Sequence, residues 1–329
     1  GAPMFIAGQD DVALADVLDE LGRVDLVHSD EERLCLSHPL LRDATESTLN
    51  VVRRSQLHSR VAVALEAEAG RPDGGRILAI ARHRLSAFQA THDAALATAA
   101  ASAGLAGAEV AHSLGARAAA EEFYLGALGA FGSLGDEERR NLQQEAVQGW
   151  MGLGQLRMDA GDAARAEEAA EEAWQLAVGP EEYGRVWWLR AEIPYQRGDL
   201  LVSIRRLQDG LRHLPRDAEV ARARLLAELG WCHVRRSEFD VAVTQLRAAV
   251  ELAYDGGDWT VLTAALDRNA YSLGATGAIA EALELFERAE LASQRCSDRS
   301  EQAMVRLIRA LARYSTWVNL LDLVRFGEA

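Results

Sequence analysis

The sequence contains no lysine, and all 35 of its basic residues are arginine. The phosphate-binding loop G-x-x-x-x-G-K-[ST] requires a lysine, so this nucleotide site is excluded within the 329 residues. Cysteine is scarce as well. Cys35, Cys232 and Cys296 lie far apart, which favours isolated thiols over a disulfide or a metal site. A surplus of positive charge is also missing, because the net charge is −15, and we therefore expect no nucleic-acid-binding face in these residues.

Proline and aromatic residues are few. The chain has 6 prolines, and aromatic residues make up 6% of it, whereas hydrophobic residues, largely Ala and Leu, make up 49%. This composition favours helix almost throughout. No apolar run approaches the roughly 18 residues that a membrane span needs, and no signal peptide opens the chain. We therefore expect a helical protein in the cytoplasm.

Catalytic and metal-binding motifs are missing too. The eight histidines show no H-x-x-x-H or H-E-x-x-H spacing, which would place two ligands on one helix face. Carboxylates such as Glu167 and Glu171 are spaced to face water from one helix rather than to form an acid–base pair. No Ser, Thr or Cys lies in a recognised nucleophile motif. We predict no catalytic, cofactor-binding or metal-binding residue in this chain and no enzymatic activity, and an active site inside a repeat cavity is the weakest alternative.

A pattern of small residues returns about every forty positions between Ala108 and Ala289. Its fixed point is a turn residue, which is glycine in four cases because the chain must reverse there. The five turn residues are Gly115, Gly161, Gly198, Ser237 and Gly277, and their successive separations are 46, 37, 39 and 40 residues.

Small residues also occupy three fixed positions around each turn residue, where they allow two antiparallel helices to approach closely. Seven residues before the turn residue lie Ala108, Gly154, Ala191, Gly230 and Ala270; five after it lie Ala120, Ala166, Ser203, Ala242 and Ala282; twelve after it lie Ala127, Ala173, Gly210, Ala249 and Ala289. The pattern predicts an all-α solenoid of stacked helix pairs.

This pattern resembles the tetratricopeptide repeat, which has Trp or Leu and a small residue on its first helix and Ala, an aromatic residue and Ala on its second. Trp150, Leu153 and Gly154 show the first half best. The usual period of that repeat is about 34 residues, and the longer period here resembles the solenoids of large bacterial activators of the maltose-regulator type. The resemblance implies a right-handed superhelix of antiparallel helix pairs with about five repeats. A sixth first helix is expected from about Glu301, which leaves a truncated sixth repeat.

The region before the repeats has a different pattern. We expect a helix, a short extended pair in which Leu34 and Leu36 alternate with polar residues, and two more helices, the first with Pro39 in its first turn. The last helix carries Leu57, Val61, Ala62 and Leu65 on one face. This order, with the letters HPLLR at residues 38–42, resembles the winged-helix segment that follows the nucleotide-binding core of signal-transduction ATPases. The resemblance is greatest to large LuxR-type regulators and to relatives joined to cyclase or kinase domains.

These resemblances imply an organisation and a function. We expect a winged-helix-like segment at 1–70, transitional helices at 76–103 and tetratricopeptide-like repeats at 104–329. The chain would be the sensor or autoregulatory arm of a larger LuxR-type transcriptional regulator, with ATP bound only in an upstream domain of the same polypeptide. A cyclase- or kinase-linked signalling ATPase and a free-standing tetratricopeptide scaffold are the alternatives.

The first helices of the repeats also predict where a partner binds. A helical stripe lies thirteen, ten, six and three residues before each turn residue, on the side that first helices present to a concave surface. Aromatic residues flanked by charged ones in this stripe favour a groove for a protein, a peptide or a small-molecule effector, with neither nucleic acid nor membrane as a direct partner. The candidate residues are Met151, Arg185, Trp188, Glu192, Tyr195, Arg224, Trp231, Asp267 and Tyr271. Among them, Arg185 and Arg224 would be available to an anionic group of the partner. The alternative is that Trp188 and Trp231 belong to the core between repeats.

Overall fold

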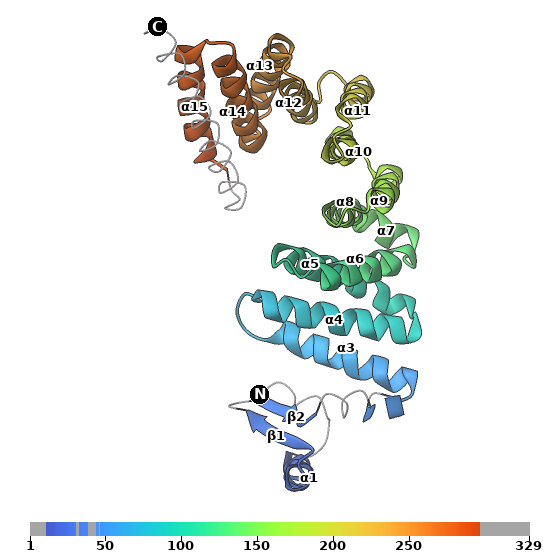
Figure 1. Cartoon of the computed structure of the whole chain (residues 1–329). Coiled ribbons are helices and arrows are strands. Elements are labelled where there is room, and N and C mark those ends of the chain that lie inside the picture. The colour runs from blue at the N-terminus through green and yellow to red at the C-terminus, as the bar shows by residue number, and fades with distance from the viewer. Residues whose placement is uncertain (1–10, 31–32, 39–43, 46, 297–329) are drawn as a thin grey trace. The chain divides into compact units, whose positions relative to one another are not determined.

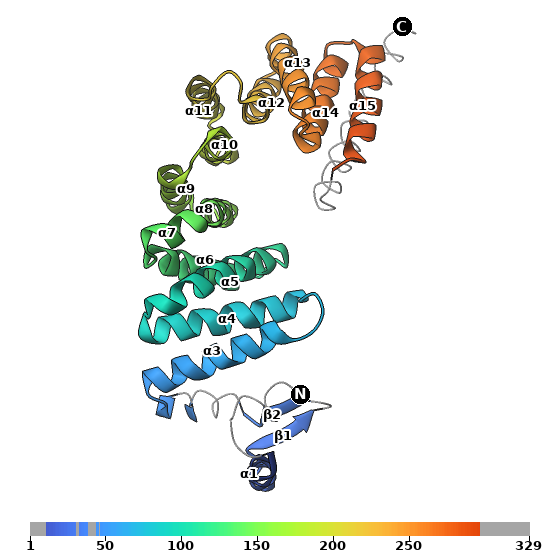
Figure 2. The same ribbon diagram turned by 180° about the vertical axis from the view of Figure 1, so that it is seen from behind.

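The structure is a computed structural model that describes residues 11–30, 33–38, 44–45 and 47–296. The chain divides into two compact units, Gly1–Leu156 and Arg157–Ala329, and each is described by itself. The described residues are almost entirely helical, and their fourteen helices are shown in Figures 1 and 2. The sixth first helix that we predicted from Glu301 lies outside the described residues.

The first unit begins with a helix and two short strands, as predicted. Strands β1 and β2 pair antiparallel, with Val27 opposite Leu36. The helix that we predicted at Pro39 lies outside the described residues, and the comparison with a winged helix stays a prediction. The elements are α1 (Asp11–Arg23), β1 (Val27–Asp30), β2 (Arg33–Leu36), α3 (Val51–Ala67), α4 (Gly74–Thr91), α5 (Ala94–Ser113), α6 (Arg117–Gly132), α7 (Asp136–Asn141) and α8 (Gln143–Asp159), which crosses into the second unit.

The second unit continues as helices joined by short turns. Neighbouring helices pack as pairs, and successive first helices also contact each other, α10 with α12 and α12 with α14. Figure 1 shows α10 and α12 along one side of this array and α11 and α13 along the other. The elements are α9 (Ala163–Leu176), α10 (Pro180–Gln196), α11 (Leu200–His213), α12 (Glu219–Arg235), α13 (Phe239–Asp255), α14 (Trp259–Ala275) and α15 (Ile279–Ser293).

All five predicted turn residues lie where one helix of a pair ends. Each has a positive φ, from 60° at Ser237 to 89° at Gly277. The residue after each turn residue donates its backbone N–H to the carbonyl oxygen five positions back. Ala278, for example, donates to Leu273 at 2.9 Å. This is the hydrogen bond of a Schellman cap. The longest separation, 46 residues, has a simple cause: the short helix α7 is inserted between the first and second pairs.

The small residues of the repeat are all buried, which confirms the predicted register. They let paired helices approach closely. A Cβ atom added at Gly230 would lie 2.5 Å from Cγ of Leu246 and 3.3 Å from the backbone oxygen of Ala242. Helices α12 and α13 therefore make contact through the backbone of the first and a fully buried leucine of the second.

Helix α5 corrects two expectations. It is long and apolar enough to cross a membrane, whereas we expected no such run. It packs against α4 and α6, however, and buries alanines such as Ala100 and Ala108 between them, as a core helix does. It also runs unbroken from Ala94 to Ser113, so the boundary that we placed between residues 103 and 104 falls inside a helix.

Candidate partner-binding face

The predicted stripe falls on first helices throughout. Met151 lies half-buried in α8, in the first unit, and is described apart from the others. The second unit holds the other eight residues: Arg185, Trp188, Glu192 and Tyr195 in α10, Arg224 and Trp231 in α12, and Asp267 and Tyr271 in α14. Any cooperation among them is therefore a property of three successive repeats.

Three aromatic residues of the stripe form a connected row across these repeats. Nε1 of Trp231 donates a hydrogen bond to the hydroxyl oxygen of Tyr195 at 2.8 Å. The Trp231 ring also meets Tyr271 edge-to-face, with 5.9 Å between ring centroids. All three side chains are half-buried. We call Tyr195, Trp231 and Tyr271 the aromatic row.

The aromatic row rests on the core that lies below it. Trp231 and Tyr271 pack against the cluster of Val234, Ala242 and Leu246. Part of each of these two side chains thus belongs to the packing between helices, while the rest is exposed. The core interpretation and the groove interpretation of Trp231 therefore both describe part of the same side chain.

Two stripe residues stand apart from the row. Trp188 is half-buried against the core cluster that α10, α11 and α12 share. Asp267 is only 2% exposed, so our prediction that it lines an accessible groove is wrong. The cause is that α14 packs against α12, α13 and α15, which turns this part of the stripe inward.

The charged groups of the stripe are paired differently from our expectation. We predicted Arg185 and Arg224 to be available to an anionic group, but Arg224 lies 3.5 Å from the Asp258 carboxylate. Arg185 is half-buried. The side chain of Asp258 also caps α14 by accepting from the backbone N–H of Val261 at 2.9 Å. Asp258 thus has two roles: it neutralises Arg224 and it caps the first turn of α14.

Two charged residues that sequence reasoning missed lie beside the aromatic row. Glu228 in α12 and Arg268 in α14 form an ion pair of 2.9 Å, and the guanidinium carbon of Arg268 lies 5.6 Å from the Trp231 ring centroid. Each stands nine residues before its turn residue, next to the stripe rather than in it. A stripe one position wider would have included both.

Glu192 lies in a different electrostatic environment. Its Oε1 accepts a hydrogen bond from Gln196 at 3.3 Å. Burial raises the pKa of Glu192, and the nearby Glu228 carboxylate raises it further, while Arg268 acts in the opposite direction. The face therefore holds two carboxylates close to one arginine.

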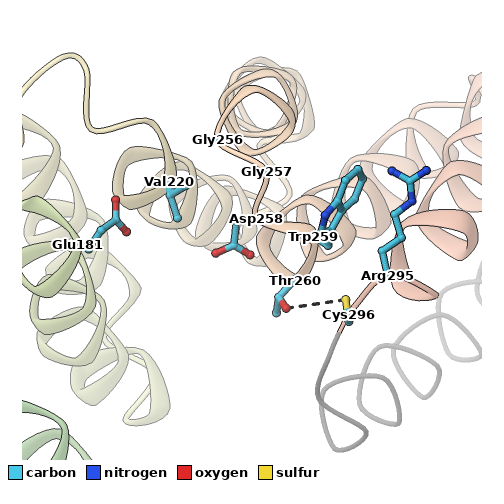
Figure 3. Close-up of a pocket in the computed structure, with 9 residues that line it drawn as sticks. All are labelled: Glu181, Val220, Gly256, Gly257, Asp258, Trp259, Thr260, Arg295 and Cys296. Carbon is cyan, nitrogen blue, oxygen red and sulfur yellow. Dashed lines mark hydrogen bonds between the residues drawn. The ribbon is translucent and has the colours of Figure 1, made fainter. Parts of the chain in front are cut away.

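A cavity of about 540 Å³ opens elsewhere in the second unit, where the first helices begin (Figure 3). Two of its charged groups have partners within the chain: Asp258 pairs with Arg224, and Arg295 lies 4.5 Å from the Trp259 ring centroid. Its lining consists of Glu181, Val220, Gly256, Gly257, Asp258, Trp259, Thr260, Arg295 and Cys296.

A second aromatic cluster joins α9, α10 and α11. The Trp174 ring lies 5.5 Å from Trp187 and 5.4 Å from His213, measured between centroids. The guanidinium of Arg190 sits over both tryptophans and pairs with Glu171. Trp187 also packs on the core. This cluster already contains its own cation, so we assign it to packing between repeats.

In the first unit, His58 of α3 and His83 of α4 meet as an interhelical pair, with 2.8 Å between their Nδ1 atoms. Burial, together with the charges of His58 and Arg82, lowers the pKa of His83 from 6.5 to about 4. The described residues contain no group of three His, Cys, Asp or Glu side chains that could hold a metal ion.

Solved structures resemble this fold. BtubC (BKLC) from P. vanneervenii aligns with a TM-score of 0.52 at 19% identity, over 68% of this chain and 91% of that one. The apo form of RapI aligns at 0.50 and 12% identity, over 87% and 86% of the two chains. The fold is an all-α, tetratricopeptide-like solenoid.

A multidomain signal-transduction ATPase with a tetratricopeptide repeat sensor, from Pyrococcus horikoshii, aligns at a TM-score of 0.44 and 10% identity, over all of this chain and 54% of that one. No family model and no curated protein sequence matches the chain.

Proposed function

We propose that this chain is a non-catalytic binding arm whose aromatic row contacts a protein or peptide partner or a small-molecule effector. The observation that carries the proposal is that three successive repeats contribute Tyr195, Trp231 and Tyr271 to one connected, half-buried row. Large rings fixed by packing, with polar groups at their edges, supply contact area at a low entropic cost. Core packing alone does not require these rings to be exposed.

We further propose that the arm belongs to a larger cytoplasmic, ATP-dependent regulator of the LuxR type. The repeat period near forty and the letters HPLLR at residues 38–42 support this assignment. Partner binding would bias an upstream ATPase between resting and active states, which is a coupling between two sites. A cyclase- or kinase-linked ATPase is the second candidate, and a scaffold without an ATPase is the third.

Sequencing the reading frame on both sides of these residues tests the regulator assignment. A lysine-containing phosphate loop upstream and a helix-turn-helix downstream are the expected findings. A cyclase or kinase domain in place of the helix-turn-helix selects the second candidate. A reading frame without a phosphate loop leaves only the scaffold.

The isolated chain is expected neither to hydrolyse ATP nor to bind DNA specifically. It lacks the lysine of a phosphate loop, and its net charge is −15. ATP turnover that persists through repurification, or a sequence-specific footprint on DNA, would contradict this expectation.

Separate substitutions of the two half-buried tryptophans test the binding face. We expect Trp231→Ala to abolish binding of a partner recovered by pull-down and confirmed with purified components, while Trp188→Ala weakens it less because Trp188 lies off the aromatic row. Trp174→Ala is the control, since that ring packs between α9 and α10. Melting temperatures of all three variants are measured alongside. A loss of binding by Trp231→Ala that only parallels a loss of folding assigns Trp231 to the core.

A further inference from the structure

The side chain of one arginine of the chain itself already lies beside the aromatic row. Arg268 reaches from α14 to α12, where its guanidinium pairs with Glu228 at 2.9 Å and lies over the Trp231 ring at 5.6 Å. The side chains of both partners are mostly shielded, with 16% of Arg268 and 22% of Glu228 exposed. A carboxylate and an aromatic face together form a favourable environment for a partly desolvated cation.

Glu192 repeats half of this arrangement in the preceding repeat. It stands six residues before its turn residue, the position that Trp231 holds in the next repeat, and one turn before Tyr195. Gln196 donates to it, but no basic side chain among the described residues forms an ion pair with it. The charged groups that influence it are Glu228 and Arg268, together with Asp159 at the end of α8.

The sum of these charges is negative. Glu192 and Glu228 lie close to a single arginine, Arg268, whose charge Glu228 already neutralises. The positive charge of Arg235 acts on Tyr195 and lowers the pKa of its hydroxyl, against the larger effect of burial. An anionic partner would therefore meet a half-buried carboxylate without a counter-ion, whereas a cationic partner would supply that counter-ion.

We propose that the aromatic row binds a basic peptide segment of a partner, with a guanidinium or ammonium group that pairs with Glu192 beside Tyr195 and Trp231. This inference rests on the proposed binding function and adds the chemical class of the partner. The bound cation takes the place beside Glu192 that Arg268 takes beside Glu228. The net charge of −15 adds a long-range attraction for such a segment.

The first test compares two blocked peptides, hexa-arginine and hexa-glutamate, by calorimetry with the whole chain at low and moderate salt. Hexa-arginine is expected to bind and hexa-glutamate is not. Glu192→Gln is expected to weaken hexa-arginine binding about tenfold, the effect of losing one charge-assisted hydrogen bond. Glu251→Gln is the matched control, because it removes the same charge from an exposed position on α13; we expect less than a twofold effect.

A stability measurement separates this role from a structural one. Because the pKa of Glu192 is raised in the folded chain, its ionised form opposes folding at neutral pH. Glu192→Gln is therefore expected to melt at the same or a higher temperature than the wild type at pH 7. A binding defect in a variant that is at least as stable as the wild type supports the proposal.

Other outcomes overturn it. Equal losses in Glu192→Gln and Glu251→Gln show that hexa-arginine responds to net charge alone. Preferential binding of hexa-glutamate refutes the proposal that the partner segment is basic. The proposed binding function of the aromatic row is still supported in that case if Trp231→Ala abolishes hexa-glutamate binding. Absence of binding by either peptide refutes the basic partner, while the reading-frame test and a purified partner still decide the proposed function separately.

Discussion

Replacing Gly230 by alanine perturbs a close approach between the paired helices α12 and α13. In an open helix, Gly→Ala stabilises by about 1 kcal/mol through helix propensity. Here the new methyl group would overlap Leu246, whose Cγ and Cδ2 atoms lie 2.5 and 2.9 Å from the added Cβ. Leu246 is fully buried beneath Trp231 and Val234 and cannot rotate away freely. Overpacking of this kind costs about 1–3 kcal/mol, so the net effect is a destabilisation of about 1 kcal/mol.

Gly129 provides the matched control. It lies inside α6, is exposed, and an added Cβ there meets nothing within 4 Å. Gly129→Ala should therefore stabilise the first unit by about 0.5–1 kcal/mol, which is opposite in sign to Gly230→Ala. The larger side chain of Gly230→Leu should destabilise more than alanine does.

Hydrogen exchange measured by mass spectrometry is the appropriate assay, because a repeat array need not unfold in one step. Gly230→Ala is expected to accelerate exchange in α12 and α13 while leaving α3 to α6 unchanged, and denaturant melts followed by circular dichroism give the change in stability. If Gly129→Ala stabilises as expected but Gly230→Ala leaves α12 and α13 unaffected, the two helices do not approach closely and the repeat register is wrong.

Three other predictions concern turns, pH and a helix cap. Ser237 holds a left-handed backbone at φ 60°, so Ser237→Gly should raise the free energy of unfolding by about 1 kcal/mol, whereas Gly277→Ala, at φ 89°, should lower it by a similar amount; a destabilised Ser237→Gly in thermal melts would contradict this. Because the pKa of His83 is lowered from 6.5 to about 4 in the folded chain, its contribution to stability is complete above pH 6.5 and is lost as the pH falls toward 4. Melts across this range should show a smaller slope for His83→Gln, and an NMR titration of His83 near pH 6.5 would refute the burial argument. Asp258→Ala should cost about 0.5–2 kcal/mol by removing the cap of α14 and the partner of Arg224, whereas Asp258→Asn should retain most of the cap; equal melting temperatures for the two variants would exclude the cap as the cause.

The repeat and its register could be read from the sequence because their causes are local. A chain that reverses between two helices needs a left-handed residue at one position, and Gly115, Gly161, Gly198 and Gly277 provide it. Helices that approach to backbone contact need small residues, and Gly230 and its equivalents in other repeats are small. Neither requirement depends on how one repeat is rotated against the next.

The sequence also determined which helix face carries the candidate residues, because the 3.6-residue period fixes that face. It did not determine which residues on the face are accessible or how they are paired. Asp267 and Tyr271 are one helical turn apart in the same stripe, yet the first is buried and the second is half-exposed. The packing of α14 against three neighbours made that difference.

The pairings across repeats were decided by the tertiary structure alone. Trp231 meets Tyr195 from 36 positions away, and Arg268 meets Glu228 from 40 positions away. Such contacts depend on the small rotation between successive repeats, which arises from the shapes of many side chains in the core together. A pattern along one chain records each residue's own helix face. It does not record that rotation, and for this reason only the structure shows Glu192 as a half-buried carboxylate beside an aromatic row.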